Sequence, residues 1–434
     1  MDKMADVLGR AGAWCGQNKY LSAIKNAFQN FMPLTIAGAI GVLWCNVLVN
    51  ESTGLGLFFK PIMALDFLNP AFQAVNFCTI SCITVGITLG IAQEIGIWNM
   101  GAERAGYIPG LVGLAAWLSV TNTSHMVDGA KEAFTGIAGN ELGATGLFTG
   151  MIIGVLSVEL FCFFEKQDAL KIKMPEQVPP GVARAFEVLV PATITLIITA
   201  CIGSACYNLT GLYLNDVIKN GVQGPLGAVG ATVPGVMIIY LVIMLFWLVG
   251  IHGNNMLSAV KEALFTPLAL ENVEAFNKGE TPKNIINMYF LQMCGEFGGS
   301  GVTIGLVIAI MIFGKREDNK AIASLSLVPG LFNINETVTF GIPMVLNPIL
   351  GIPFVFACLV TILVGYVLTV IGFCPVACLT VPWTTPPIVF GFLACGANVM
   401  GAVTQAILIV VSTVIYTPFL IAYEKYQNKQ AAEA

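Results

Sequence analysis

The stretch AIASLSLVPGLFNINETVTFGIPMVLNPILGIPFVFACLV, residues 321–360, opens an apolar run that continues to residue 423 and contains one charged residue, Glu336. A charge at the middle of a bilayer costs about 3 kcal/mol or more, so a long uncharged run is typical of membrane-spanning segments. This run is too long for a single crossing. It therefore predicts several spans, and the prolines and glycines on both sides of Glu336 predict a broken, re-entrant segment there.

The whole chain shares this apolar character. Of its 434 residues, 56% are hydrophobic and 10% are charged, whereas about 25% of residues are charged in an ordinary soluble domain. This composition excludes a soluble globular protein. The formal net charge of −5 offers no basic face, so nucleic acid is not expected as a partner. The 12 cysteines form no CxxC pair and no nucleotide-binding loop is present, so we expect no disulfide framework, no metal and no cofactor.

Windows with few charged residues predict an all-α integral membrane protein with about ten transmembrane helices plus re-entrant hairpins. The predicted spans lie at about 31–50, 72–93, 106–124, 144–164, 187–213, 225–250, once within 253–299, and at 299–314, 351–374 and 402–422. Basic residues precede the first span and follow the last, so we expect both termini in the cytoplasm. Residues 1–30 mix apolar side chains with Arg10, Lys19 and Lys25, which predicts an amphipathic helix at the membrane surface, with a frayed cytosolic tail as the alternative.

The predicted spans fall into two halves. Residues 31–220 have regular spans and GxxxG steps at Gly146, Gly150 and Gly154, which allow close helix packing and make oligomerisation through this half a hypothesis. Residues 221–434 have short apolar pieces interrupted by Gly and Pro. Broken helices at membrane depth either line a cavity or pack against protein. We therefore predict the binding site in the C-terminal half.

Two ionisable residues of this half are candidates for chemistry. Glu336 lies among amides and a hydroxyl in Asn333-Ile334-Asn335-Glu336-Thr337. Ionisable groups inside a membrane are functional by default, and a protonated Glu that locks two helices is the structural alternative. His252 follows an apolar span in a glycine-flanked turn, where it is either a structural residue or shares a polar pocket with Glu336.

Three further features accompany this pair. Gly299 and Ser300 lie in a glycine-rich turn that is either a backbone nest for ligand oxygens or a flexible break. Trp383 lies among prolines and threonines and either stacks on a sugar ring or belongs to the interfacial aromatic belt. Glu296 is either a solvated cytosolic residue or a gate.

Four ordered motifs support a family resemblance. They are Gly250-Ile251-His252-Gly253, the run 298–306, the run 333–348 and Val381-Pro382-Trp383-Thr384-Thr385-Pro386-Pro387. Together, over essentially the whole chain, they resemble the membrane IIC component of the lactose/cellobiose/diacetylchitobiose family of the bacterial phosphoenolpyruvate-dependent phosphotransferase system.

The resemblance implies a multi-pass protein of the bacterial cytoplasmic membrane. Its N-terminal half would form a homodimer, and its C-terminal half would bind a disaccharide, with N,N′-diacetylchitobiose expected first and cellobiose second. The implied partners, besides membrane lipid, are a soluble IIB protein that carries a phosphocysteine and the IIA protein that charges it. None of the 12 cysteines lies in a recognisable IIB loop, so we expect the phosphodonor on a separate chain.

The resemblance also assigns roles to residues. Glu336 corresponds to the acid near the sugar hydroxyl that accepts phosphate, and His252 to the histidine that contacts the same end of the sugar. The other predicted sugar-binding residues are Asn333, Asn335, Trp383, Gly299 and Ser300. Thr337 and Thr339 stand where the family pattern leads us to expect Pro and Ile, so a more polar or less rigid hairpin is expected.

Two other classes of function remain open at this stage. In a proton-coupled symporter, Glu336 and His252 would carry protons. In a membrane scaffold without transport, the protein would bind no sugar.

Overall fold

Helices make up nearly all the regular structure, because a helix satisfies its backbone hydrogen bonds internally and so suits an apolar sequence in a bilayer. The computed structural model describes residues 10, 14, 17–51, 56, 59–125, 134–175, 177–225 and 230–433. Within these residues the strands are β1 (Ser124–His125) and β2 (Phe134–Thr135), which pair antiparallel. Most of the predicted surface helix before residue 17 lies outside the described residues.

The chain divides into two units, which we describe separately. Unit 2 consists of Gln17–Gly38 and Ala74–Gly227. Its helices are most of α2 (Lys19–Leu43), then η4 (Phe77–Ser81), α4 (Ile83–Met100), α5 (Ala102–Ala105), α6 (Ile108–Val120), α7 (Gly139–Leu142), α8 (Ala144–Glu165), η5 (Asp168–Leu170), α9 (Pro180–Thr210), α10 (Leu214–Ile218) and η6 (Lys219–Gln223). Helix α2 continues through residue 30 without a break.

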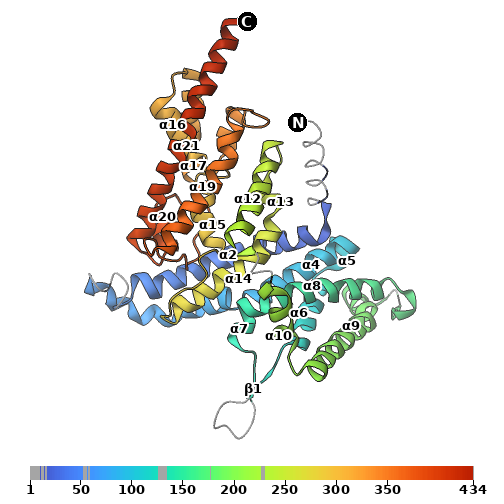
Figure 1. Ribbon diagram of the computed structural model, residues 1–434. Coiled ribbons are helices and arrows are strands. Elements are labelled where there is room, and N and C mark those ends of the chain that lie inside the picture. The colour runs from blue at the N-terminus through green and yellow to red at the C-terminus, as the bar shows by residue number, and fades with distance from the viewer. Residues whose placement is uncertain are drawn as a thin grey trace. The chain divides into compact units, whose positions relative to one another are not determined.

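The GxxxG glycines of α8 allow close packing between helices of the same chain. Helices α4, α6 and α8 contact one another (Figure 1). A Cβ atom added at Gly150 would lie 2.2 Å from the Thr88 Oγ1 atom on α4, so only glycine allows this approach. Gly146 and Gly154 are buried as well. These glycines therefore support packing within one chain, and the predicted oligomerisation through this half stays a hypothesis.

Several charged groups of unit 2 form ion pairs between helices. Glu165 is 2% exposed and accepts hydrogen bonds from Arg104 and Arg184. Glu159 forms an ion pair of 2.6 Å with Lys19. These ion pairs connect different helices of unit 2, which is consistent with a structural role.

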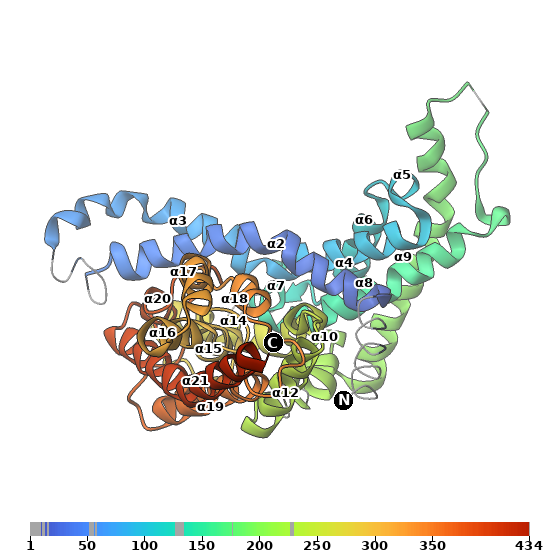
Figure 2. The ribbon, with the colours of Figure 1, turned by 90° about the horizontal axis from the view of Figure 1, so that it is seen from above.

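Unit 1 consists of Met1–Gly16, Ala39–Gln73 and Ala228–Ala434. Its elements, apart from the end of α2, are η1 (Trp44–Leu48), η3 (Lys60–Leu68), most of α3 (Asn69–Asn76), α12 (Val233–Leu248), α13 (Gly253–Met256), α14 (Ser258–Asn277), α15 (Met288–Gly295), α16 (Ile304–Phe313), α17 (Glu317–Leu331), α18 (Glu336–Gly341), α19 (Gly351–Val370), α20 (Val389–Ala394) and α21 (Val399–Glu433). Helix α21 contacts α16, α19 and α20, which lie together in the view from above (Figure 2).

Five described helices are long and apolar enough to cross a membrane, or six if one bent pair counts as a single span. They are Lys19–Leu48, Ala144–Glu165, Pro180–Thr210, Gly351–Val370 and Val399–Glu433, with the pair Lys60–Ser81 and Ile83–Met100 bent by 42°. The shorter apolar helices α6, α12 and α16 coincide with three further predicted spans. The predicted total of about ten is therefore not confirmed, because these three have fewer than the roughly 20 residues of a plain span.

The apolar run around Glu336 is broken, as its prolines and glycines predict. Helix α17 ends at Leu331, α18 has 6 residues, and α19 begins at Gly351. The Asn347 side-chain oxygen accepts hydrogen bonds from the N–H groups of Ile349 and Leu350 and so caps the start of α19. This break places Glu336 at the start of a short helix inside an otherwise apolar segment.

Candidate functional site

Glu336 and His252 face each other across two helix breaks in unit 1. Glu336 is the first residue of α18, and His252 precedes α13. The His252 Nε2 atom lies 3.9 Å from the Glu336 Oε1 atom, and the two side chains are 37% and 49% exposed. A neutral histidine and a carboxylate at this distance make no direct hydrogen bond, so both keep capacity for a ligand.

The hydrogen bond at the other ring nitrogen of His252 fixes its tautomer. The Asn255 backbone N–H donates to His252 Nδ1 at 3.2 Å and so caps α13. In a neutral imidazole the proton then lies on Nε2, the nitrogen that faces Glu336. The buried Trp247 ring packs 4.4 Å from the imidazole and holds its orientation. The structure thus presents a proton donor and a proton acceptor to the same space.

Asn333 connects three separate segments of the site. Its Oδ1 atom accepts a hydrogen bond of 2.6 Å from the Gly298 N–H. Its Nδ2 atom donates to the carbonyl oxygens of Trp383 at 2.5 Å and Thr385 at 3.1 Å. The Asn333 backbone has φ of +63°, a left-handed conformation that asparagine tolerates. The Asn333 side chain therefore links the glycine-rich turn and the Trp383 segment to the segment that contains Glu336.

Gly299, Ser300 and Asn335 form a tightly packed contact behind the acid. The Asn335 Nδ2 atom donates to the Ser300 carbonyl at 2.7 Å. Gly299 has φ of +88°, and a Cβ atom there would lie 2.6 Å from the Asn335 Cβ atom. Both the backbone conformation and the close approach require glycine. This turn is therefore fixed against the residue that precedes Glu336, which argues against a flexible break. A backbone nest for ligand oxygens at this turn stays a prediction.

A buried polar network lies on the other side of Ser300. The Asn254 Nδ2 atom donates to Ser300 Oγ at 2.9 Å, and the Lys261 ammonium donates to Asn254 Oδ1 at 3.0 Å. Lys261 also pairs with Glu296, which accepts a second hydrogen bond of 2.7 Å from the Tyr240 hydroxyl. The side chains of Lys261 and Glu296 are 7% and 18% exposed. Glu296 is therefore a paired, largely buried residue, and the solvated alternative is wrong.

The sequence reasoning missed Lys261, Tyr240 and Asn254 as members of the site. Lys261 and Glu296 lie 35 residues apart on different elements, so no local pattern joins them. The one signal in the sequence was Glu296, an isolated charge in an otherwise apolar stretch.

The structure brings all seven predicted site residues together but exposes them unequally. Glu336, His252 and Trp383 offer accessible side chains, with Trp383 44% exposed. Asn335 and Ser300 are 4% and 5% exposed, and the Asn333 amide is engaged by backbone groups. This arrangement favours sugar contact by the first three and loop positioning by the others. The role of each residue stays a prediction.

Comparison with known proteins settles the family. The model of the phosphotransferase system EIIC family matches residues 25–358. The chain belongs to the EIIC family.

Full-length relatives of this EIIC are similar over nearly the whole chain. It is 33% identical to the oligo-beta-mannoside-specific EIIC component of Bacillus subtilis strain 168, over 98% of this chain and 94% of that protein. It is 29% identical to the cellobiose-specific EIIC component of Lactococcus lactis subsp. lactis strain IL1403, over 98% of each. The crystal structure of the transporter ChbC, the IIC component of the N,N′-diacetylchitobiose-specific phosphotransferase system, superposes with a TM-score of 0.88 at 29% identity, covering 97% of each chain.

This EIIC is thus a membrane-embedded sugar permease of the cellobiose, lactose and chitobiose type. Membership of the family implies a sugar substrate and a IIB partner. A proton-coupled symporter is not favoured, because every one of these relatives is named as part of a phosphotransferase system.

Proposed function

We propose that this EIIC binds a neutral β-linked disaccharide in unit 1 and presents its 6-hydroxyl group to the phosphocysteine of a separate IIB protein. The observation that carries this proposal is the opposition of His252 Nε2–H and the Glu336 carboxylate, with 3.9 Å between Nε2 and Oε1. A hydroxyl oxygen placed beside this pair accepts a hydrogen bond from Nε2–H and donates one to the carboxylate.

The same geometry supports a transfer step. As the sugar oxygen attacks phosphorus in line, its proton passes to the Glu336 carboxylate, the new O–P bond forms, and the S–P bond breaks to release the IIB thiolate. His252 holds the attacking oxygen through Nε2–H. The phosphate group adds charge to the sugar, so the product does not return across the apolar barrier. Uptake is vectorial for this reason.

The polar surroundings suit a sugar more than an apolar ligand. A disaccharide has many hydroxyl groups that need partners once water is removed. Trp383 adds an aromatic face on which a pyranose ring can stack. We propose N,N′-diacetylchitobiose as the first candidate, on the structural similarity to ChbC, and cellobiose as the second, on the similarity to a cellobiose-specific relative.

The proposal extends to assembly and orientation. We propose that residues 31–220 form a homodimer, that residues 221–434 hold the sugar, and that both termini lie in the cytoplasm. Basic residues near the chain ends support this orientation. A IIA protein upstream would recharge IIB after each cycle.

Vesicle uptake measurements test this function. We expect right-side-out vesicles to accumulate phosphorylated disaccharide only when phosphorylated IIB is enclosed, with no effect of an uncoupler. Uptake of free sugar that persists without a phosphodonor and collapses with an uncoupler would contradict the proposal and support a symporter.

A competition assay with the purified protein tests the substrate. N,N′-diacetylchitobiose, cellobiose and lactose should displace labelled sugar in that order. Failure of all three to bind would contradict a permease for these disaccharides, as expected of a scaffold without transport.

A further inference from the structure

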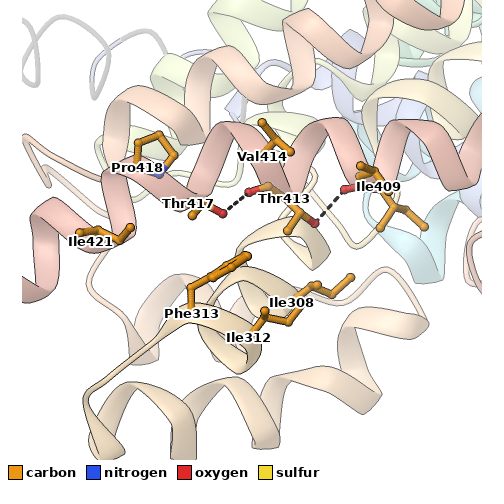
Figure 3. Close-up of a pocket in the computed structure, with 10 residues that line it drawn as sticks. Ile308, Ile312, Phe313, Ile409, Thr413, Val414, Thr417, Pro418 and Ile421 are labelled. Atoms are coloured by element: carbon orange, nitrogen blue, oxygen red, sulfur yellow. Dashed lines mark hydrogen bonds between the residues drawn. The ribbon is translucent and has the colours of Figure 1, made fainter.

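The surface between α16 and α21 contains an apolar groove outside the sugar site. Its volume is about 740 Å³, and Figure 3 shows side chains from both helices around it. The lining residues are Ile308, Ile312, Phe313, Ile409, Val410, Thr413, Val414, Thr417, Pro418 and Ile421. Several of the large side chains stay open to the outside, including Ile312 at 63% and Val414 at 64% exposure. The groove is therefore an accessible surface feature of two apolar helices.

The two threonines of the groove offer no free hydrogen-bond donor to a ligand. The Thr413 hydroxyl donates to the Ile409 carbonyl at 2.9 Å, and the Thr417 hydroxyl donates to the Thr413 carbonyl at 2.7 Å, as the dashed lines in Figure 3 show. Both hydroxyls are thus satisfied by the backbone of their own helix. The groove accordingly fits a hydrocarbon and excludes a sugar.

Two exposed lysines lie at one end of the groove. Lys315 follows Phe313 by two residues, and Lys425 lies one helical turn beyond Ile421 on the same face of α21. Both lysines are exposed. The Lys315 backbone N–H donates to the Glu424 carboxylate at 2.8 Å, which brings this lysine to the turn of α21 that carries Lys425.

The ammonium groups of this end are available for a ligand. Neither Lys315 nor Lys425 forms an ion pair or hydrogen bond through its side chain with any residue that the structure describes. The neighbouring Arg316 and Lys320 are instead paired with Asp318 and Glu317. Two lysines therefore offer free ammonium groups at this end of the groove, beside the buried Glu424 carboxylate.

We propose that the groove binds an anionic phospholipid, with an acyl chain along α16 and α21 and its phosphate at Lys315 and Lys425. From Ile409 to Ile421 an α-helix rises about 18 Å, close to half of the roughly 30 Å hydrocarbon core. The groove thus matches the depth of one leaflet, and the lysines lie where a headgroup begins. Juxtamembrane lysines attract anionic lipids through the same charge complementarity.

Photo-crosslinking in vesicles tests this site. The probes are phosphatidylglycerol and phosphatidylcholine with the same photoreactive acyl chain, and the readout is the amount of adduct on the peptides that contain 308–313 and 409–421. We expect about 30-fold more adduct from phosphatidylglycerol, since two lysines contribute at the headgroup. The double variant Lys315→Gln/Lys425→Gln should reduce the phosphatidylglycerol adduct to the phosphatidylcholine level.

Matched variants make the result specific. Lys429→Gln removes a lysine of the same helix that already pairs with Glu433, so it should leave the preference unchanged. Val414→Trp should reduce the adducts of both lipids by filling the groove, whereas Val367→Trp on α19 should not. Equal labelling by the two lipids, or a preference that survives in Lys315→Gln/Lys425→Gln, would overturn the proposal. An unlabelled groove that instead crosslinks to a second copy of the chain would also overturn it.

Discussion

His252 Nε2 and Glu336 Oε1 lie 3.9 Å apart although 84 positions separate the two residues in the chain. Each begins a short helix, with His252 as the cap of α13 and Glu336 as the first residue of α18. Two breaks in apolar segments therefore lie side by side, and the His252 imidazole and the Glu336 carboxylate face the same space. This meeting point is the basis of the proposed transfer chemistry.

Glu336→Gln should separate binding from transfer. Glutamine keeps the shape and can hydrogen-bond a hydroxyl but does not accept its proton, so phosphorylation-coupled turnover should fall by about 10²–10⁴-fold while sugar affinity changes less. Sugar binding and transfer from phosphorylated IIB would be measured on the same preparation. Glu274→Gln, which alters an exposed carboxylate paired with Lys278, is the control. Equal turnover in Glu336→Gln and the parent would reject the assigned role.

His252→Asn should test the imidazole without loss of the helix cap. Asparagine is a good cap residue and can replace Nδ1 as acceptor for the Asn255 N–H, but it lacks the Nε2–H group. We expect sugar affinity to fall about tenfold, the cost of about one hydrogen bond, with turnover reduced as well and the apparent melting temperature nearly unchanged. His252→Ala should reduce both activities and stability. Unchanged sugar affinity in both variants would argue against contact.

The sequence singles out His252 and Glu336 as candidates, because each lies in a polar interruption of an apolar segment. Glycines flank His252, and glycines and prolines precede and follow the polar run that contains Glu336, so both interruptions are visible in the sequence. Their separation was not predictable, since it depends on how α12, α13, α17 and α18 pack. The same limit applied to Asn333 and Asn335. Their sequence position suggested sugar ligands, whereas their hydrogen bonds to Gly298, Trp383 and Ser300 favour positioning of the surrounding loops.

Asn333→Asp should loosen the Trp383 segment selectively. Aspartate keeps an oxygen acceptor for the Gly298 N–H but loses the donors to the Trp383 and Thr385 carbonyls. We expect about a tenfold loss of sugar affinity, in line with one or two lost hydrogen bonds. Asn398→Asp, at an exposed asparagine whose side-chain oxygen accepts a hydrogen bond from the Met400 N–H, keeps that acceptor and should have no effect. An unaltered affinity in Asn333→Asp would show that the bonds to Trp383 and Thr385 are dispensable.

The Lys261–Glu296 pair should show strong coupling in a double-mutant cycle. Lys261→Met leaves Glu296 without its counter-charge in a largely buried place, at a cost of about 3 kcal/mol. Lys261→Met combined with Glu296→Gln removes both charges and should recover much of that loss. Apparent melting temperatures in detergent would report the effect, with the exposed Lys278→Met as the control. Additive losses in the double variant would mean that the pair makes no net interaction.

The count of spans illustrates a second limit of sequence reasoning. A crossing was predicted within 253–299, and this stretch contains α14, which carries Lys261, Glu262, Glu271 and Glu274 and is not among the candidate spans. Charge windows assume that every charge faces lipid or water. The buried pair of Lys261 with Glu296 does not meet this assumption. Charge-free windows therefore do not locate helices reliably in the interior of a helical bundle.

Thr339→Val should stabilise the protein. The Thr339 hydroxyl is fully buried and has no hydrogen-bond partner among the residues that the structure describes, so its isosteric removal should raise stability by about 1 kcal/mol. An increase in apparent melting temperature would be the readout. Thr361→Val is the matched control, because the buried Thr361 hydroxyl donates to the Cys358 carbonyl and its loss should not stabilise. A lower melting temperature for Thr339→Val would show that this hydroxyl has a partner.

The most direct measurement is the position of the sugar in an experimental structure of this EIIC with bound N,N′-diacetylchitobiose or cellobiose. Our account predicts the 6-hydroxyl oxygen within about 2.6–3.2 Å of a Glu336 carboxylate oxygen, with His252 Nε2 at the same end of the sugar. A 6-hydroxyl group directed away from Glu336, or a sugar bound outside the space between Glu336, His252 and Trp383, would contradict it.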